Sequence, residues 1–204
     1  MRVAVFAKAP VPGQVKTRLA PLLGDEGAAA LQAGLVQRAL STAIAAGIGP
    51  VELHCAPDER HEFFARCAAR FGVDLVPQLG ADLGERMRNA FERAFALRHS
   101  LVVIGTDCPS LEVRDLRAAR DALAGAPAVL APAEDGGYVL IGLAARVPGL
   151  FDGVDWGTSA VLRQTRRRFS EAGVQCTQLR ELWDLDRPED YARLQAEGLM
   201  EVLG

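Results

Sequence analysis

The chain has 204 residues, of which 50% are hydrophobic, so it is long enough to bury one sizeable core. We therefore expect a single domain over residues 1–204. Its 23 basic and 26 acidic side chains give a formal net charge of −3. This balance lacks the basic excess typical of proteins that bind nucleic acids or anionic membranes, so we expect neither as a partner.

The expected location of the protein follows from its apolar runs and its cysteines. The apolar run before Lys8 is too short for a signal sequence, and no window approaches the length of a membrane span. The four cysteines are scattered without the paired spacing of a zinc site, which favours reduced thiols. A cytoplasmic protein is expected.

Apolar runs alternate with helix-period segments along the chain. The predicted strands are Val3–Ala7, Val51–Cys55, Val73–Val76, Leu101–Ile104, Ala128–Ala131 and Tyr138–Leu143, and the predicted helices span residues 26–46, 58–71, 83–98 and 112–124. Several strands are continuously apolar, as burial on both faces of a parallel sheet requires. The predicted fold class is α/β, with three layers (α/β/α), a central, mostly parallel mixed sheet, and a less regular part after about residue 133.

Basic side chains follow the first predicted strand in the stretch "KAPVPGQVKTR". In open parallel sheets, ligands bind outside the carboxyl ends of the strands. Prolines and a glycine disfavour a long helix here, so we expect an extended or single-turn loop that projects Lys16 and Arg18 to one side, towards an anion such as phosphate. The structural alternative is a solvated basic loop. No Walker or G-x-G-x-x-G motif occurs.

Two glycines follow the third predicted strand, in "PQLGADLGERM". Asp82 and Glu85 have the spacing of a helix capping box, which explains them structurally. Gln78, Gly80 and Gly84 remain as candidates for contact with a flat ligand such as a nucleobase.

An acidic residue, Asp107, follows the fourth predicted strand in "IGTDCPSL". Ser110 is better placed to cap the next helix, so the Asp107 carboxylate is expected to serve a ligand instead. Magnesium usually takes one or two protein carboxylates. The second candidate is Asp135, Asp184 or Asp186, and turn or capping roles compete for Asp135 and Asp186.

Taken in order, the basic loop, "QLGADLG", "GTDCPSL", "DGGYVLIGL" and "DLDRPEDY" resemble the GT-A fold of nucleotide-diphospho-sugar transferases, in particular an uncharacterised, glycosyltransferase-like bacterial branch. The likeness covers nearly the whole chain. It implies that Lys8, Lys16 and Arg18 bind nucleotide phosphates, that the 78–84 stretch borders the base, and that Asp107 and Asp186 hold Mg²⁺ or Mn²⁺. "FAKAPVPGQ" replaces the usual L-x-G-G loop of nucleotidyltransferases, and D-C-P replaces the D-x-D of glycosyltransferases.

Three functions remain open at this point. The first is a nucleotidyltransferase that transfers a nucleotidyl group from a nucleoside triphosphate to a sugar or another phosphorylated metabolite, with Lys16, Arg18 and Asp107 as catalytic residues. The second is a glycosyltransferase with a nucleotide-sugar donor, and the third is a non-catalytic nucleotide-binding module. The basic loop favours the first, because a triphosphate needs more cationic partners than a diphosphate. A homodimer is left open.

The acceptor is expected beyond the nucleotide half, beside Asp135, Tyr138, Trp156 and Thr158. Aromatic faces stack on sugar rings, and Thr158 is placed to contact a hydroxyl group. The structural alternatives are that Trp156 packs in the core or a lid and that Thr158 is the N-cap of a helix running to about residue 172.

Overall fold

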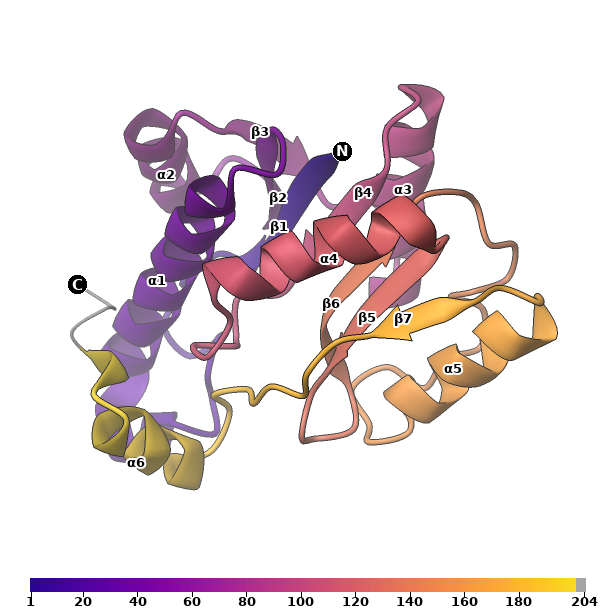
Figure 1. Ribbon diagram of the computed structural model, residues 1–204. Coiled ribbons are helices and arrows are strands. Elements are labelled where there is room, and N and C mark those ends of the chain that lie inside the picture. Colours follow the sequence, from indigo (N-terminus) through magenta and orange to yellow (C-terminus); the bar gives the residue numbers. More distant parts are fainter. Residues whose placement is uncertain (201–204) are drawn as a thin grey trace.

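The computed structural model describes residues 1–200 and contains a seven-stranded mixed sheet (Figure 1). The strand order is β3-β2-β1-β4-β6-β5-β7, and β6 runs antiparallel to both of its neighbours. The strands are β1 (Arg2–Lys8), β2 (Val51–Ala56), β3 (Asp74–Pro77), β4 (Leu101–Ile104), β5 (Ala128–Pro132), β6 (Tyr138–Leu143) and β7 (Cys176–Gln178). The predicted α/β class with a mostly parallel mixed sheet is confirmed.

Helices cover both faces of the sheet. They are α1 (Ala20–Ala46), α2 (Glu62–Phe71), α3 (Leu83–Ala96), α4 (Val113–Gly125), α5 (Val161–Glu171) and α6 (Pro188–Ala196). Side chains of α1, α2 and α4 share one hydrophobic cluster, and those of α3 and α5 share another. In Figure 1, α4 crosses in front of the strands, and α6 lies beside the first turns of α1.

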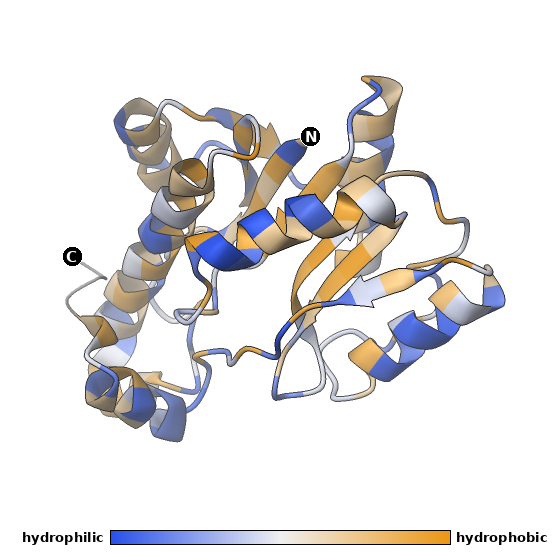
Figure 2. Cartoon of the chain, viewed as in Figure 1, coloured by the Kyte–Doolittle hydropathy of each residue, from blue (hydrophilic) through white to orange (hydrophobic). Residues whose placement is uncertain are grey.

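The apolar pattern of the strands explains these two layers. In β4, Val102 and Ile104 face the α1–α2–α4 cluster, while Leu101 and Val103 face the α3–α5 cluster. Successive side chains of a strand point to opposite faces, so both faces of β4 are buried and the strand is continuously apolar. Figure 2 shows this as hydrophobic strands beside helices with alternating polar and apolar residues.

The six predicted strands and four predicted helices are all present, with differences at their ends. The first helix starts at Ala20, before the predicted residue 26, and is kinked at Gly24, where φ is 70°. The second starts at Glu62 because His61 is its N-cap and accepts a hydrogen bond from Phe63 N. The short strand β7 was not predicted, and the short helix α6 was indicated only by the capping pattern proposed for Asp186.

The sheet topology decides where a ligand site forms. Strand β1 pairs in parallel with β2 on one side and with β4 on the other. The strands β2 and β3 are added on one side of β1, and the next strand, β4, is added on its other side. This reversal of strand order opens a crevice at the carboxyl ends of β1 and β4. Within residues 1–200, no helix is both long and apolar enough to cross a membrane.

Candidate functional site

A cavity of about 530 Å³ lies at the carboxyl ends of β1 and β4. It brings together six residues that the sequence singled out: Lys8, Lys16, Arg18, Gln78, Asp107 and Asp186. They come from the end of β1 and its loop, from the segments after β3 and β4, and from the segment before α6. Ligand pockets typically measure about 300–1,000 Å³, so the cavity is large enough for a small molecule.

Lys16 lies in the floor of this cavity and ties three segments together. Its side chain is only 4% exposed, and its Nζ is 2.6 Å from Asp107 Oδ1. The same Nζ donates a hydrogen bond to the Leu185 carbonyl at 2.6 Å, while Leu185 N donates to the Asp107 carbonyl at 2.7 Å. The loop after β1, the end of β4 and the segment before α6 therefore meet at one ammonium group.

Arg18 lies at the rim of the cavity, where its exposed guanidinium forms an ion pair with Asp186. The loop that carries both cations is a series of turns rather than an extended segment, with hydrogen bonds from Gln14 N to Val11 O and from Leu19 N to Lys16 O. Lys16 has a φ of 48°, which is uncommon for a residue with a side chain. Both cations line the cavity, but each is paired with a carboxylate of the protein.

The carboxylates near Lys16 influence one another. The pKa of Asp184 is raised to about 7, mainly by burial and also by the charges of Asp107 and Asp135, while Lys16 opposes the shift. Asp184 itself does not line the cavity wall, whereas Asp107 and Asp186 do. The acidic side chains of three separate loops therefore lie close enough together to repel.

The donor set limits the kind of metal site that fits here. Among the residues described, no three His, Cys, Asp or Glu side chains are grouped so that they would hold a metal ion. Asp107 and Asp186, which both border the cavity, offer only hard oxygen donors. This set fits Mg²⁺ or Mn²⁺ held by one or two carboxylates, with water and phosphate oxygens completing the shell, and it does not form an all-protein cage.

Helix capping leaves Asp107 and Asp186 available to the cavity. The N-cap of α4 is Glu112, which forms a capping box with Asp115, so the expected Ser110 cap is wrong. Before α6, the Asp190 carboxylate accepts hydrogen bonds from the backbone N of both Asp186 and Arg187. The expected capping alternative for Asp186 is therefore also wrong, because the side chain that bonds to the backbone at the start of α6 is Asp190.

Gln78 is part of the cavity wall, and its amide holds two strand ends together. Its Nε2 donates to the Ala7 carbonyl at 3.2 Å and to the His54 carbonyl at 2.8 Å. The expected capping role of Asp82 is confirmed, because its carboxylate accepts a hydrogen bond from Glu85 N at 2.8 Å.

Gly80 and Gly84 do not line this cavity, although the sequence suggested base contacts for both. A Cβ on Gly80 would lie 2.6 Å from Glu85 Cβ, and one on Gly84 would lie 2.6 Å from Trp156 Nε1. Close packing against the protein thus explains why both positions are glycine.

The residues expected on the acceptor side also lie outside the cavity. Tyr138 and Trp156 meet edge to face with ring centroids 6.5 Å apart, and Trp156 also contacts Phe151. Burial raises the pKa of the Tyr138 hydroxyl, which lies 3.9 Å from Met87 Sδ. The geometry favours the structural alternative, in which Trp156 packs against its neighbours.

Asp135 and Thr158 make local backbone contacts. The Asp135 carboxylate accepts a hydrogen bond from Gly137 N at 2.8 Å, in the predicted turn between β5 and β6. The Thr158 hydroxyl donates to the Asp155 carbonyl and accepts from Ala160 N. The N-cap of α5 is Ala160, so the expected N-cap at Thr158 is wrong by two residues.

Polar groups of the cavity wall that sequence reasoning missed include Arg86 and the Gln32–Thr106 pair. Arg86 Nε donates to the Gly80 carbonyl, and Gln32 Nε2 donates to the Thr106 hydroxyl at 3.3 Å. The signal for Arg86 was its place in the first turn of the helix that follows the glycine-rich stretch. Gln32 gave a weaker signal, a buried polar residue in the middle of α1.

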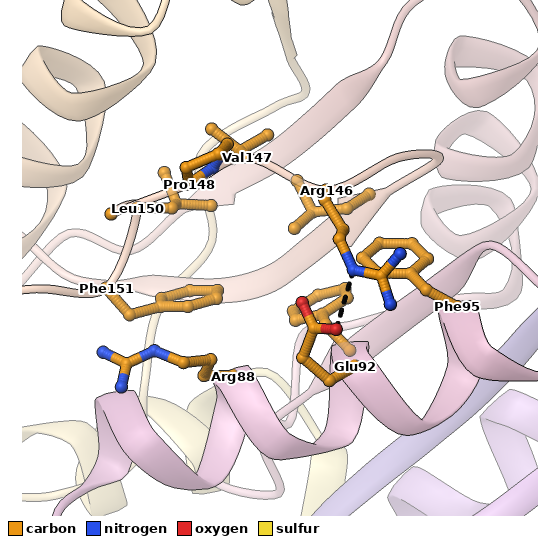
Figure 3. A pocket seen from close by; sticks show the side chains of 11 residues that line it. Arg88, Glu92, Phe95, Arg146, Val147, Pro148, Leu150 and Phe151 are labelled. Atoms are coloured by element: carbon orange, nitrogen blue, oxygen red, sulfur yellow. Dashed lines mark hydrogen bonds and ion pairs between the residues drawn. The ribbon is translucent and has the colours of Figure 1, made fainter.

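A smaller cavity of about 200 Å³ lies between α3 and the 146–151 loop (Figure 3). Arg146 Nε donates to Glu92 at 2.7 Å and its guanidinium lies over the Phe95 ring, while Arg88 pairs with Asp152. The charged groups around this cavity pair with protein groups, as those of the larger cavity do. It is the weaker candidate because it is smaller and is lined by none of the residues that the sequence singled out.

Comparisons with known proteins agree with the fold. The family model described as "Uncharacterized protein conserved in bacteria (DUF2064)" matches residues 39–158, more than half of the chain. A protein from Desulfovibrio desulfuricans G20, provisionally named a nucleotide-diphospho-sugar transferase, has a solved structure that is 31% identical, with a TM-score of 0.83 over 91% of this chain and 82% of that one. No curated protein matches the sequence.

More distant structures share the fold alone. A nucleotidyl transferase from Methanothermobacter thermautotroptrophicus is 16% identical, with a TM-score of 0.64 over 98% of this chain and 99% of that one. Rv0371c from Mycobacterium tuberculosis, solved in complex with manganese, is 18% identical, with a TM-score of 0.53 over 95% and 97%. The chain therefore belongs to the bacterial DUF2064 family and has the fold of the nucleotide-diphospho-sugar transferases.

Proposed function

We propose that the chain is a metal-dependent transferase that moves a nucleotidyl group from a nucleoside triphosphate to a sugar or another phosphorylated metabolite. The observation that carries this proposal is the convergence of Lys16, Arg18, Asp107 and Asp186 on one cavity at the carboxyl ends of β1 and β4. The transferase names of the structural neighbours support the same reaction class.

In this proposal, the residues that line the cavity fall into three groups with different roles. Lys8, Lys16 and Arg18 bind the phosphates, Lys16 as a point charge and Arg18 as a planar fork. Gln78 borders the base. Asp107 and Asp186 hold Mg²⁺ or Mn²⁺, and the bound metal would neutralise charge on the phosphate oxygens.

The reaction follows from this arrangement. An acceptor oxygen attacks the α-phosphorus, the new P–O bond forms as the bond to the β-phosphate oxygen breaks, and pyrophosphate leaves. Lys16 and Arg18 hold the phosphate chain in line and stabilise the charge that develops on the leaving group. Positioning and charge neutralisation are the catalytic contributions of the protein.

A glycosyltransferase that uses a nucleotide-sugar donor is the second candidate, favoured by the provisional name of the Desulfovibrio relative. Lys8, Lys16 and Arg18 favour the triphosphate, which carries more negative charge than a diphosphate ester. The third candidate, a non-catalytic nucleotide-binding module, is disfavoured because both candidate metal carboxylates line the cavity.

Thermal unfolding separates these candidates. A ligand that binds only the native state raises the melting temperature. The protein is heated with each nucleoside triphosphate and each of several nucleotide sugars, with Mg²⁺, with Mn²⁺ and with EDTA. Metal-dependent stabilisation by a triphosphate, followed by pyrophosphate release with sugar phosphates, is expected. Stabilisation by nucleotide sugars alone would favour the glycosyltransferase, and stabilisation by neither class would contradict nucleotide binding.

A further inference from the structure

Two of the cations that line the cavity are paired with its two carboxylates. Lys16 pairs with Asp107, and Arg18 pairs with Asp186. If the proposed function holds, the first member of each pair binds phosphate and the second binds metal. Each group therefore already has a protein partner at the position where its ligand would bind.

From this geometry we infer that metal and nucleotide bind cooperatively by exchanging these ion pairs. The metal takes the carboxylates from the cations, and the cations turn to the phosphates. This inference rests on the proposed function and adds a coupling between its two ligands. Either ligand alone meets a site that is partly occupied by a charge of its own sign.

The electrostatic reason is strongest at Lys16. Its ammonium is buried and lies 2.6 Å from Oδ1 of Asp107, whose carboxylate would hold the metal. A divalent cation approaching that carboxylate is repelled by the ammonium, and phosphate approaching the ammonium is repelled by the carboxylate. Repulsion between partly buried charges is weakly screened by water and salt.

Lys16 has enough donors for the exchange. An ammonium carries three N–H groups, and one of them already bonds to the Leu185 carbonyl. When Asp107 turns to the metal, the hydrogen bond to Leu185 keeps Lys16 in place. The N–H group that had pointed at Asp107 is then available to a phosphate oxygen. The exchange therefore leaves no buried charge without a partner, which would otherwise be costly.

The second pair is looser. The side chains of Arg18 and Asp186 are 65% and 45% exposed, so water screens their attraction. The coupling is thus expected to depend mostly on Lys16 and only slightly on Arg18.

The test measures Mn²⁺ binding, by electron paramagnetic resonance of the free ion and by calorimetry, in the wild type and in Lys16→Met, which keeps the stem and removes the charge. Without nucleotide, Lys16→Met is expected to bind Mn²⁺ about tenfold more tightly than the wild type. In the wild type, a non-hydrolysable triphosphate is expected to tighten Mn²⁺ binding at least about tenfold, and Mn²⁺ must tighten triphosphate binding by the same factor. Lys16→Met is expected to lose most of this coupling.

Lys8→Met is the matched control. Lys8 lines the same cavity and is exposed, and no salt bridge to it is found within residues 1–200. Removing its charge should change the affinity for Mn²⁺ alone only slightly, about twofold or less. If Lys16→Met does not fold, Arg18→Met tests the same exchange at Asp186, with an expected tightening of about two- to threefold.

Three results would overturn the inference. Weaker or unchanged Mn²⁺ binding in Lys16→Met would mean that Lys16 holds Asp107 in place for the metal instead of competing with it. Equal tightening in Lys8→Met would mean that net charge alone is responsible. If neither the wild type nor any variant binds Mn²⁺, with or without triphosphate, the proposed function itself fails and the exchange with it.

Discussion

The sequence indicated two regions as candidates for ligand binding, and the structure shows that only one of them lines the charged cavity. The charged cavity, lined by Lys16, Arg18, Asp107 and Asp186, is built from loops that follow parallel strands and from the segment before α6. The aromatic cluster of Tyr138, Phe151 and Trp156 packs against α3.

The two regions use their side chains differently. In the cavity, opposite charges lie beside open space, where a ligand can replace one partner of each pair. In the aromatic cluster, the rings contact each other and Gly84, so their surfaces are already used for packing. The position of a residue at a strand end was thus a better guide to the cavity than its ability to stack on a sugar.

The largest expected effect is on nucleotide binding by Asp107→Asn. Asparagine keeps an oxygen for Lys16 but loses the charge that a divalent metal requires, so metal-dependent triphosphate binding should weaken at least about a hundredfold. Calorimetry with Mg²⁺ and a triphosphate measures this loss, and circular dichroism checks the fold. Asp121→Asn is the control, because Asp121 is exposed on α4 and pairs with its neighbour Arg120. Unchanged binding in Asp107→Asn would show that the charged cavity is not the metal site.

A second prediction uses the raised pKa of Asp184, about 7 in the folded protein against about 3.9 in an unfolded chain. Between these values the folded state holds the proton and the unfolded state has released it, so this group lowers stability as pH rises from about 4 to about 7. Asp184→Asn cannot ionise. In EDTA, its stability advantage over the wild type should therefore be about 2–3 kcal/mol larger at pH 8 than at pH 5.

Urea unfolding of both proteins at the two pH values measures this difference. Trp156→Phe is a control from the aromatic cluster, and its effect on stability should be the same at pH 5 and pH 8. An Asp184→Asn effect that is equally independent of pH would mean that neither burial nor the neighbouring carboxylates raise the pKa of Asp184.

Gly84→Ala tests the aromatic cluster. The added Cβ would lie 2.6 Å from Trp156 Nε1 and 3.0 Å from the Phe151 carbonyl oxygen, so the unfolding free energy should fall by about 1–3 kcal/mol. Gly125→Ala, also helical but with no atom within 4 Å of its added Cβ, should be neutral or slightly stabilising. Chemical denaturation compares them. If Gly84→Ala lost nucleotide binding without losing stability, Gly84 would contact the ligand instead of serving the packing of the aromatic cluster.

The smallest expected effect is that of Arg18→Lys. The charge remains, but the planar fork is lost, so triphosphate binding should weaken only about three- to tenfold. Nucleoside affinity should stay the same, because Arg18 is expected to contact phosphate alone. Calorimetry with a triphosphate, its diphosphate and the nucleoside provides the comparison, and equal losses for all three would show that the loop shapes the cavity without binding phosphate.

Much of the fold was predictable because its signals are local. Continuous apolar runs such as Leu101–Ile104 indicate strands buried on both faces, and the Asp82–Glu85 spacing indicates a helix start. The strand β7 was missed because three residues carry too little periodic pattern, and the nine residues of α6 were indicated only by a capping pattern. The capping residues of α4, α5 and α6 were misplaced because the backbone path decides where each helix starts, and the N-cap of α5 is even an alanine.

The sequence by itself determined the α/β class, the strands, and the charged residues that follow β1 and β4, since each of these depends on neighbours along the chain. Only the tertiary structure decided how the charged residues are paired. Lys16 meets the Leu185 carbonyl 169 positions away, and Asp107 becomes its partner because three loops converge at one sheet edge. The same long-range packing placed Gly84 against Trp156. Such contacts depend on which helices, strands and loops pack together, and the local sequence pattern does not show this.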